Sequence, residues 1–66
     1  MQVKYEEVEV RLTGEDGNAY AIIGNVSRAL KRSGVSAEEV TAFQDEAMSG
    51  DYDNVLRTAM RWVSVS

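Results

Sequence analysis

The sequence predicts a small α+β domain in which three helices pack against one face of a two-stranded sheet. Apolar residues alternate with charged residues near the start of the chain and with serines at its end, as in strands with one buried face. Between these segments they recur three times at helical spacing. The 66 residues contain no repeat and no linker-like tract, so residues 1–66 are expected to form one domain in β-α-α-α-β order.

The first strand is predicted over residues 8–12, where valine and leucine alternate with glutamate and arginine. The apolar residues at positions 3 and 5 fall on the opposite parity, so the pattern slips at residues 6–7. A bulge there, or a different pairing of the first residues, would restore the buried face. The composition of residues 13–18 then predicts a turn.

The first helix is expected to begin near Asn18, with Asn18 or Asp16 as its N-cap and Gly34 as its stop. Gly24 lies inside the helix at a cost of about 1 kcal/mol relative to alanine, which suggests a close approach by another backbone or by a partner. The residues predicted to share its buried face are Ala19, Ile22, Ile23, Val26, Ala29 and Leu30.

The second helix has the clearest start signal in the chain. Ser36 and Glu39 have the spacing of a capping box, and Val35 with Val40 has the spacing of a hydrophobic staple. The helix is expected to end at residues 49–50. Its predicted inward residues are Val40, Phe43 and Ala47.

The third helix is expected to follow Asp51 or Asp53 as its N-cap, and residues 62–66 to form a short strand that pairs with residues 8–12. A two-stranded sheet is marginal alone, so two chains are predicted to join their strands into a four-stranded sheet in a homodimer. The predicted buried stripe of the third helix is Tyr52, Val55, Leu56, Ala59, Met60 and Val63.

The composition narrows the possible functions. The chain has no cysteine and no histidine, which removes disulfides, thiolate or imidazole metal sites and the usual nucleophile–base pairs. We therefore expect no catalytic residues, no metal site and no cofactor. The longest apolar run, residues 19–23, is too short to span a bilayer and no secretory signal is recognisable, so a cytoplasmic protein without a membrane partner is expected.

A helix-turn-helix motif is one hypothesis, because Gly34 has the position of a corner between the first two helices. The second helix would then enter DNA, but it carries Glu38, Glu39, Asp45 and Glu46, which would repel phosphates. The formal net charge of −4 adds to that repulsion. Nucleic acid is therefore not the expected partner, and a DNA-binding regulator is kept as an alternative.

Several segments resemble a group of short uncharacterised proteins encoded by bacteria, plasmids and phages. They are the GEDGNAYAIIG segment at residues 14–24, with residues 34–36, 49–53 and 60–63. The similarity covers most of the chain after Leu12. It implies a small accessory protein of a mobile element, with no activity or catalytic residue to carry over.

The function expected from these observations is that of a non-enzymatic, dimeric interaction protein that modulates a host or phage protein. A small-ligand sequestering protein with a pocket at the dimer interface is a further alternative. The five aromatic residues are spread singly through the predicted elements, so most are expected in the core, while Trp62 is also a candidate interface anchor. The expected partner-binding residues are Glu15, Asp16, Gly17, Asn18, Arg57, Arg61 and Trp62.

Overall fold

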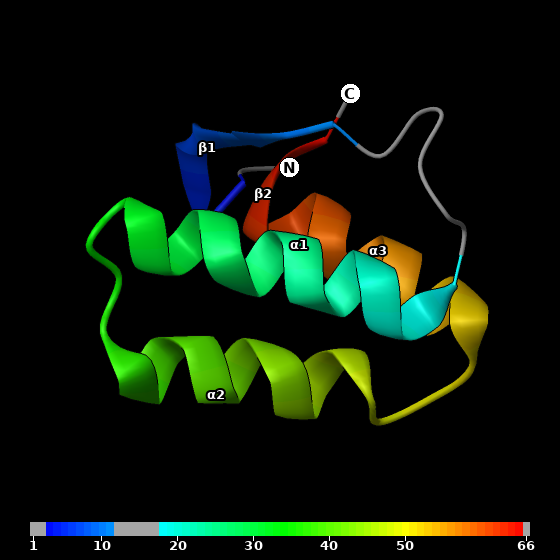
Figure 1. The fold of residues 1–66 in the computed structure, drawn as a ribbon. Coiled ribbons are helices and arrows are strands. Elements are labelled where there is room, and N and C mark those ends of the chain that lie inside the picture. Colours follow the sequence, from blue (N-terminus) through cyan, green and yellow to red (C-terminus); the bar gives the residue numbers. More distant parts are fainter. Residues whose placement is uncertain (1–2, 12–17, 66) are drawn as a thin grey trace.

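The computed structural model describes residues 3–11 and 18–65. The elements follow the order β1 (Tyr5–Val10), α1 (Ala19–Arg32), α2 (Ala37–Ala47), α3 (Tyr52–Trp62) and β2 (Val63–Val65). The predicted α+β class and β-α-α-α-β order are therefore confirmed (Figure 1). The turn expected over residues 13–18 lies, apart from its last residue, outside the described residues.

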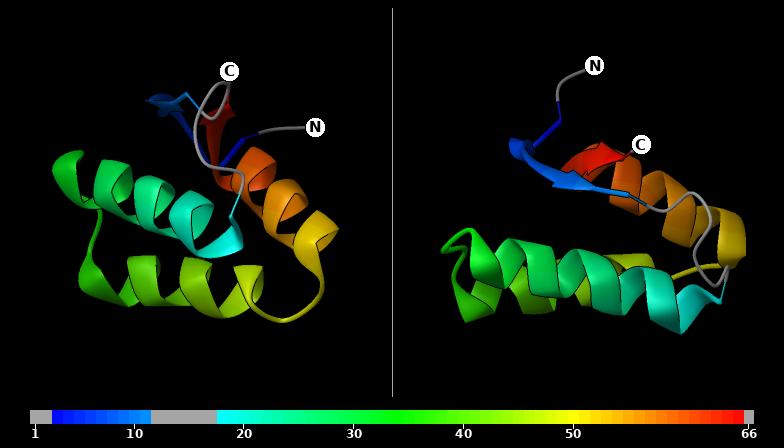
Figure 2. Two further views of the ribbon diagram at one scale, coloured as in Figure 1. Left: turned by 45° about the vertical axis from the view of Figure 1, so that its right-hand side comes forward. Right: turned by 45° about the horizontal axis from the view of Figure 1, so that its top comes forward.

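The elements form three layers. The sheet lies over α1 and α3, and α2 packs on the opposite side of these two helices (Figures 1 and 2). Strand β1 contacts α1 while β2 contacts α3, and α2 contacts both helices of the middle layer. All three helices thus lie on one face of the sheet, as the sequence predicts.

The two strands are parallel, and the three helices supply the long crossover that parallel neighbours need. The paired residues are Tyr5 with Val63, Glu9 with Ser64 and Val10 with Val65. Four positions separate the first two paired residues of β1, whereas their partners in β2 are adjacent, so β1 bulges between them. The predicted slip at residues 6–7 is this irregularity.

Helix α1 has the predicted start and stop. The Asn18 side chain accepts a hydrogen bond of 2.8 Å from the backbone N–H of Tyr20, and Gly34 adopts φ 88° just beyond the helix. The expected close approach of another backbone to Gly24 is wrong for the described part of the chain, because a Cβ placed there would meet no atom within 4 Å outside the helix's own backbone. A close approach of a partner to Gly24 stays a prediction.

Helix α2 forms half of the predicted capping box. The Ser36 hydroxyl accepts from the Glu39 backbone N–H at 3.3 Å, but the Glu39 carboxylate turns to Lys4 and Tyr5 instead of returning to the cap. The residues predicted to face inward, Val40, Phe43 and Ala47, are all buried.

Helix α3 is capped by Asp51, whose carboxylate accepts from the Asn54 backbone N–H at 3.0 Å. Its predicted stripe is partly wrong, because Tyr52 and Met60 are exposed. The buried face is Val55, Thr58, Ala59 and Trp62. These positions are three, four and seven apart, the spacing of a single helical face, and Met60 falls outside it.

The core lies between the sheet, the middle layer and α2. No buried side-chain polar atom in the described residues lacks a hydrogen-bond partner. None of the helices in residues 3–11 and 18–65 is long and apolar enough to cross a membrane. The buried hydrophobic residues are Val8, Val10, Ile22, Ile23, Val26, Leu30, Val40, Phe43, Ala47, Val55, Ala59, Trp62 and Val63.

Candidate interaction surface

The residues expected to bind a partner do not form one surface. Residues 15–17 lie outside the described residues, and Asn18 uses its side chain to cap α1. Asn18 stands at the start of α1 and Trp62 at the end of α3, and these two helix ends lie toward opposite ends of the middle layer (Figure 1).

Trp62 belongs to the core. Its side chain is packed so that the residue is only 5% exposed. The indole stacks on Tyr5, with ring centroids 6.0 Å apart, and meets the Phe43 ring edge to face at 5.5 Å. The ring therefore joins β1, α2 and α3, and it has little surface left to offer a partner.

Arg61 and Trp62 both bind the same carboxylate oxygen of Glu46. The Arg61 guanidinium donates to Oε2 at 2.9 Å, and the indole Nε1–H donates to it at 3.2 Å. The hydrogen bond from Arg61 is the main reason that the pKa of the Glu46 carboxyl lies below its ordinary value. Two residues expected to bind a partner thus fasten α3 to α2.

A second carboxylate, that of Glu39, binds Lys4 and Tyr5 near Trp62. Lys4 Nζ and the Tyr5 hydroxyl both lie 2.8 Å from Glu39 Oε1, and Lys4 Nζ is 4.1 Å from the centroid of an indole ring of Trp62. The hydrogen bond from Lys4, followed by that from Tyr5, lowers the pKa of Glu39. The same contacts with Glu39 raise the pKa of Lys4 and of the Tyr5 phenol.

Arg57 is the remaining member of the expected set. It is exposed on α3 one turn before Arg61, and it forms no salt bridge with a carboxylate of the described residues. Its guanidinium is therefore available to solvent or to a partner.

A different surface gathers exposed apolar side chains. Tyr20, Met48 and Tyr52 are 78%, 53% and 45% exposed, and they line one hollow of about 350 Å³. Among the described residues, Met60 is the fourth large apolar side chain with high exposure, and it does not line this hollow. Exposed apolar side chains scattered singly are ordinary on proteins, whereas three around one depression make it a candidate contact surface.

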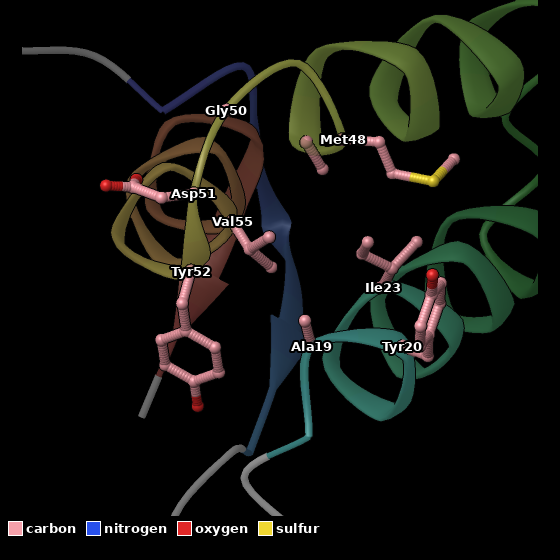
Figure 3. Close-up of a pocket in the computed structure, with 9 residues that line it drawn as sticks. Ala19, Tyr20, Ile23, Met48, Gly50, Asp51, Tyr52 and Val55 are labelled. Atoms are coloured by element: carbon pink, nitrogen blue, oxygen red, sulfur yellow. The ribbon is translucent and has the colours of Figure 1, made fainter.

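The hollow, called the Tyr20–Met48–Tyr52 hollow below, is formed where the start of α1, the end of α2 and the start of α3 meet. The two tyrosines stand on opposite sides of it, with Ile23 and Val55 between them (Figure 3). Ala19 and Ala47 also line it, and their small side chains leave the depression unfilled. The Asp51 carboxylate points away from its centre (Figure 3).

The connection between α2 and α3 holds one rim of the hollow in place. The Asn54 side-chain amide donates to the backbone carbonyls of Glu46 and Ala47, at 2.9 and 3.2 Å. A Cβ at Gly50 would stand only 3.0 Å from the Asn54 Cβ, so glycine lets the connection pass close to that side chain. A rim fixed by side-chain hydrogen bonds loses little conformational entropy when a partner binds.

Sequence reasoning missed this hollow. Tyr20 and Tyr52 were expected among mostly buried aromatics, and Tyr52 was placed in the inward stripe of α3. One signal was present, because Tyr20 falls off the helical face shared by Ala19, Ile22 and Ile23. An aromatic residue on the polar side of an amphipathic helix is a candidate contact residue.

The described residues contain no group of three or more aspartate, glutamate, cysteine or histidine side chains that could hold a metal ion. No protein-family model matches the chain, and no curated protein or solved structure is significantly similar to it.

Proposed function

We propose that this chain is a non-enzymatic interaction protein that binds and modulates a partner protein through the Tyr20–Met48–Tyr52 hollow. The observation that carries the proposal is the gathering of three exposed apolar side chains around one depression at the end of the helical layers. Tyrosine and methionine are enriched at protein interfaces, where each brings a large apolar area to the contact.

The form of the hollow suits a side chain from a protein. Its floor is apolar, and two tyrosine rings stand at its sides, so an inserted aliphatic or aromatic side chain would be shielded from water on several faces. Binding energy at interfaces concentrates on such anchors in shielded pockets.

The DNA-binding alternative receives no support from the charges on α2. The sequence of the helix, AEEVTAFQDEA, contains four carboxylates and no lysine or arginine. Glu38 and Asp45 are exposed on it, while Glu39 and Glu46 are held by Lys4 and Arg61. Helices α1 and α2 also run antiparallel side by side (Figures 1 and 2), whereas the helices of a helix-turn-helix cross steeply.

Small-ligand binding is the second candidate. A volume of about 350 Å³ is within the range of ligand pockets, which begin near 300 Å³. A metabolite that occupied the hollow would raise the melting temperature, because it binds only the folded chain. A melting temperature that no fraction of cellular metabolites changes would contradict this candidate.

A homodimer with a four-stranded sheet stays a prediction. The described residues leave one edge of β1 and one edge of β2 without a neighbouring strand, and such a dimer would use one of these edges. The molar mass from light scattering tests it, and a monomer at micromolar concentration would contradict it.

The proposed function is tested with Met48→Ser, matched by Met60→Ser. Both methionines are 53% exposed, but only Met48 lines the hollow. The tagged chain and both variants are incubated with lysate of the organism that encodes it, with and without nuclease treatment, and captured proteins are identified by mass spectrometry. We expect one protein whose capture falls about tenfold with Met48→Ser, the loss of a contact worth about 1.4 kcal/mol, and is unchanged with Met60→Ser.

Equal capture by both variants would show that the hollow is not the contact surface. Capture that nuclease abolishes would contradict the protein-binding proposal and favour a nucleic-acid partner. Both variants should retain the circular dichroism spectrum of the parent chain, because substitutions at exposed positions rarely change stability by more than about 0.5 kcal/mol.

A further inference from the structure

A second surface, which shares no residue with the hollow, lies between β1 and the second half of α1. Two adjoining depressions of about 200 and 210 Å³ run along it and share Glu9, Ala29 and Arg32. Residues 7–11 line one side of this groove. On the other side it is lined by Asn25, Arg28, Ala29, Arg32 and Ser33.

The strand side of the groove is an open sheet edge. β1 pairs with β2 on one side only, and no described residue pairs with its other edge. The backbone N–H and C=O groups of an unpaired edge can bond an added strand. Four residues of β1, at positions 7–10, line the groove together with Arg11, which follows the strand. This length is enough to pair with a short extended segment.

The helix side of the groove is basic. Arg28 and Arg32 lie one turn apart on α1 and line the groove together. Neither forms a salt bridge with a carboxylate in the part of the chain that the structure describes. Arg28 donates to the Asn25 side chain, which holds its guanidinium over the helix. The helix therefore presents two cations to whatever enters the groove.

The spacing of these cations matches a strand. Side chains one helical turn apart have Cβ atoms about 5–6 Å apart. Alternate residues of a strand are about 6.6 Å apart and point to the same face. We propose that the groove between β1 and α1 binds an extended peptide segment of another protein, which adds a strand to β1 and places acidic residues at two alternate positions against Arg28 and Arg32.

The other face of the added strand would lie beside Glu7 and Glu9. Val8 and Val10 are buried toward the helices, so the two glutamates point to the opposite face of β1. Neutral or basic residues are therefore favoured at the intervening positions of the segment, because like charges directly opposite one another destabilise a strand pair. The recognised pattern is acidic toward α1 and non-acidic beside Glu7 and Glu9, while Arg11, which follows β1, adds a third cation to the groove.

A second copy of this chain fits the groove less well. Pairing β1 with β1 of another molecule around a two-fold axis would place Arg28 and Arg32 of one α1 beside the same arginines of the other. In the register that pairs position 8 with itself, it would also set Glu7 opposite Glu9. An acidic segment from another protein neutralises these arginines, whereas a second copy adds to their charge.

The test is a titration of the ¹⁵N-labelled chain with the peptide acetyl-Thr-Glu-Thr-Glu-Thr-amide, followed by ¹H–¹⁵N NMR. We expect saturable shifts confined to β1 and to residues 25–33. The double variant Arg28→Gln with Arg32→Gln should weaken binding about fivefold, the loss of two exposed ion pairs. The matched double variant Lys31→Gln with Arg57→Gln removes the same charge from exposed positions outside the groove and should leave affinity unchanged.

The same peptide with every backbone amide methylated separates strand addition from simple charge attraction. It keeps both carboxylates but cannot donate backbone hydrogen bonds, so we expect it not to bind. The proposal is overturned if the methylated peptide binds as well as the parent, if both double variants lose affinity equally, or if no resonance moves at millimolar peptide. A dimeric mass by light scattering, with the β1 amides protected from exchange, would also overturn it and assign the edge to a second copy.

Discussion

Replacing Trp62 tests whether this residue stabilises the folded chain as part of the core or serves as an interface residue for a partner. The indole is buried against Tyr5 and Phe43, and its Nε1–H donates to Glu46. Truncation of a buried tryptophan to alanine costs about 3–5 kcal/mol. A chain of 66 residues has a total stability of about 3–10 kcal/mol. Trp62→Ala is therefore expected to remove between about a third and all of the free energy of unfolding.

Trp62→Phe gives the smaller and more informative change. It retains an aromatic ring between Tyr5 and Phe43 but loses the hydrogen bond to the half-exposed Glu46 carboxylate, which is worth about 1 kcal/mol. Combining it with Glu46→Ala in a double-mutant cycle should return a coupling energy of about 1 kcal/mol.

The assay is urea unfolding followed by far-ultraviolet circular dichroism, because Trp62 is the only tryptophan and its variants lose the fluorescence signal. A loss below about 1 kcal/mol for Trp62→Ala would refute the reasoning, since a side chain that contributes so little is not a core residue. Such a result would return Trp62 to the set of possible interface anchors.

The remaining predictions concern two glycines and the decrease in stability at acidic pH. Gly34→Ala should lower the free energy of unfolding by about 1–2 kcal/mol, because φ is 88° there. Gly24→Ala should raise it by about 0.5–1 kcal/mol, because Gly24 lies inside α1 and the new Cβ would meet no atom within 4 Å outside the helix's own backbone. The urea midpoints of the two variants should therefore move in opposite directions. The pKa values of Glu39 and Glu46 are lowered in the folded chain, so their stabilisation is present above the ordinary carboxyl pKa and disappears as the pH falls through the lowered values. The urea concentration at the unfolding midpoint should therefore decrease once the pH is below about 4. A midpoint concentration that stays constant down to pH 3 would contradict the two ion pairs.

Features that depend on a few neighbouring residues could be predicted from the sequence. The caps at Asn18, Ser36 and Asp51 each form with a backbone N–H two or three positions ahead. Spacing therefore identifies Ser36 and narrows each of the other two caps to a pair of candidates, Asn18 or Asp16 and Asp51 or Asp53. The bulge in β1 was visible as a change of parity, because a side chain on the wrong face of a strand needs a local correction.

Features that depend on distant packing could not be predicted. Met60 belongs to an apolar stripe by spacing, but the contacts of α3 with α1, α2 and β2 turn the helix so that Trp62 is buried in preference to it. The Tyr20–Met48–Tyr52 hollow forms where three helix ends meet, and no local sequence pattern predicts that meeting.

The proposed docking at the Tyr20–Met48–Tyr52 hollow is tested most directly by labelling the methionine methyl groups with ¹³C. The chain has three methionines, of which Met48 lines the hollow while Met60 lies outside it with the same 53% exposure. When the captured partner protein is added, we expect the Met48 methyl resonance to shift or broaden and that of Met60 to stay in place. An unchanged Met48 resonance in a saturated complex would contradict the proposed docking at the hollow.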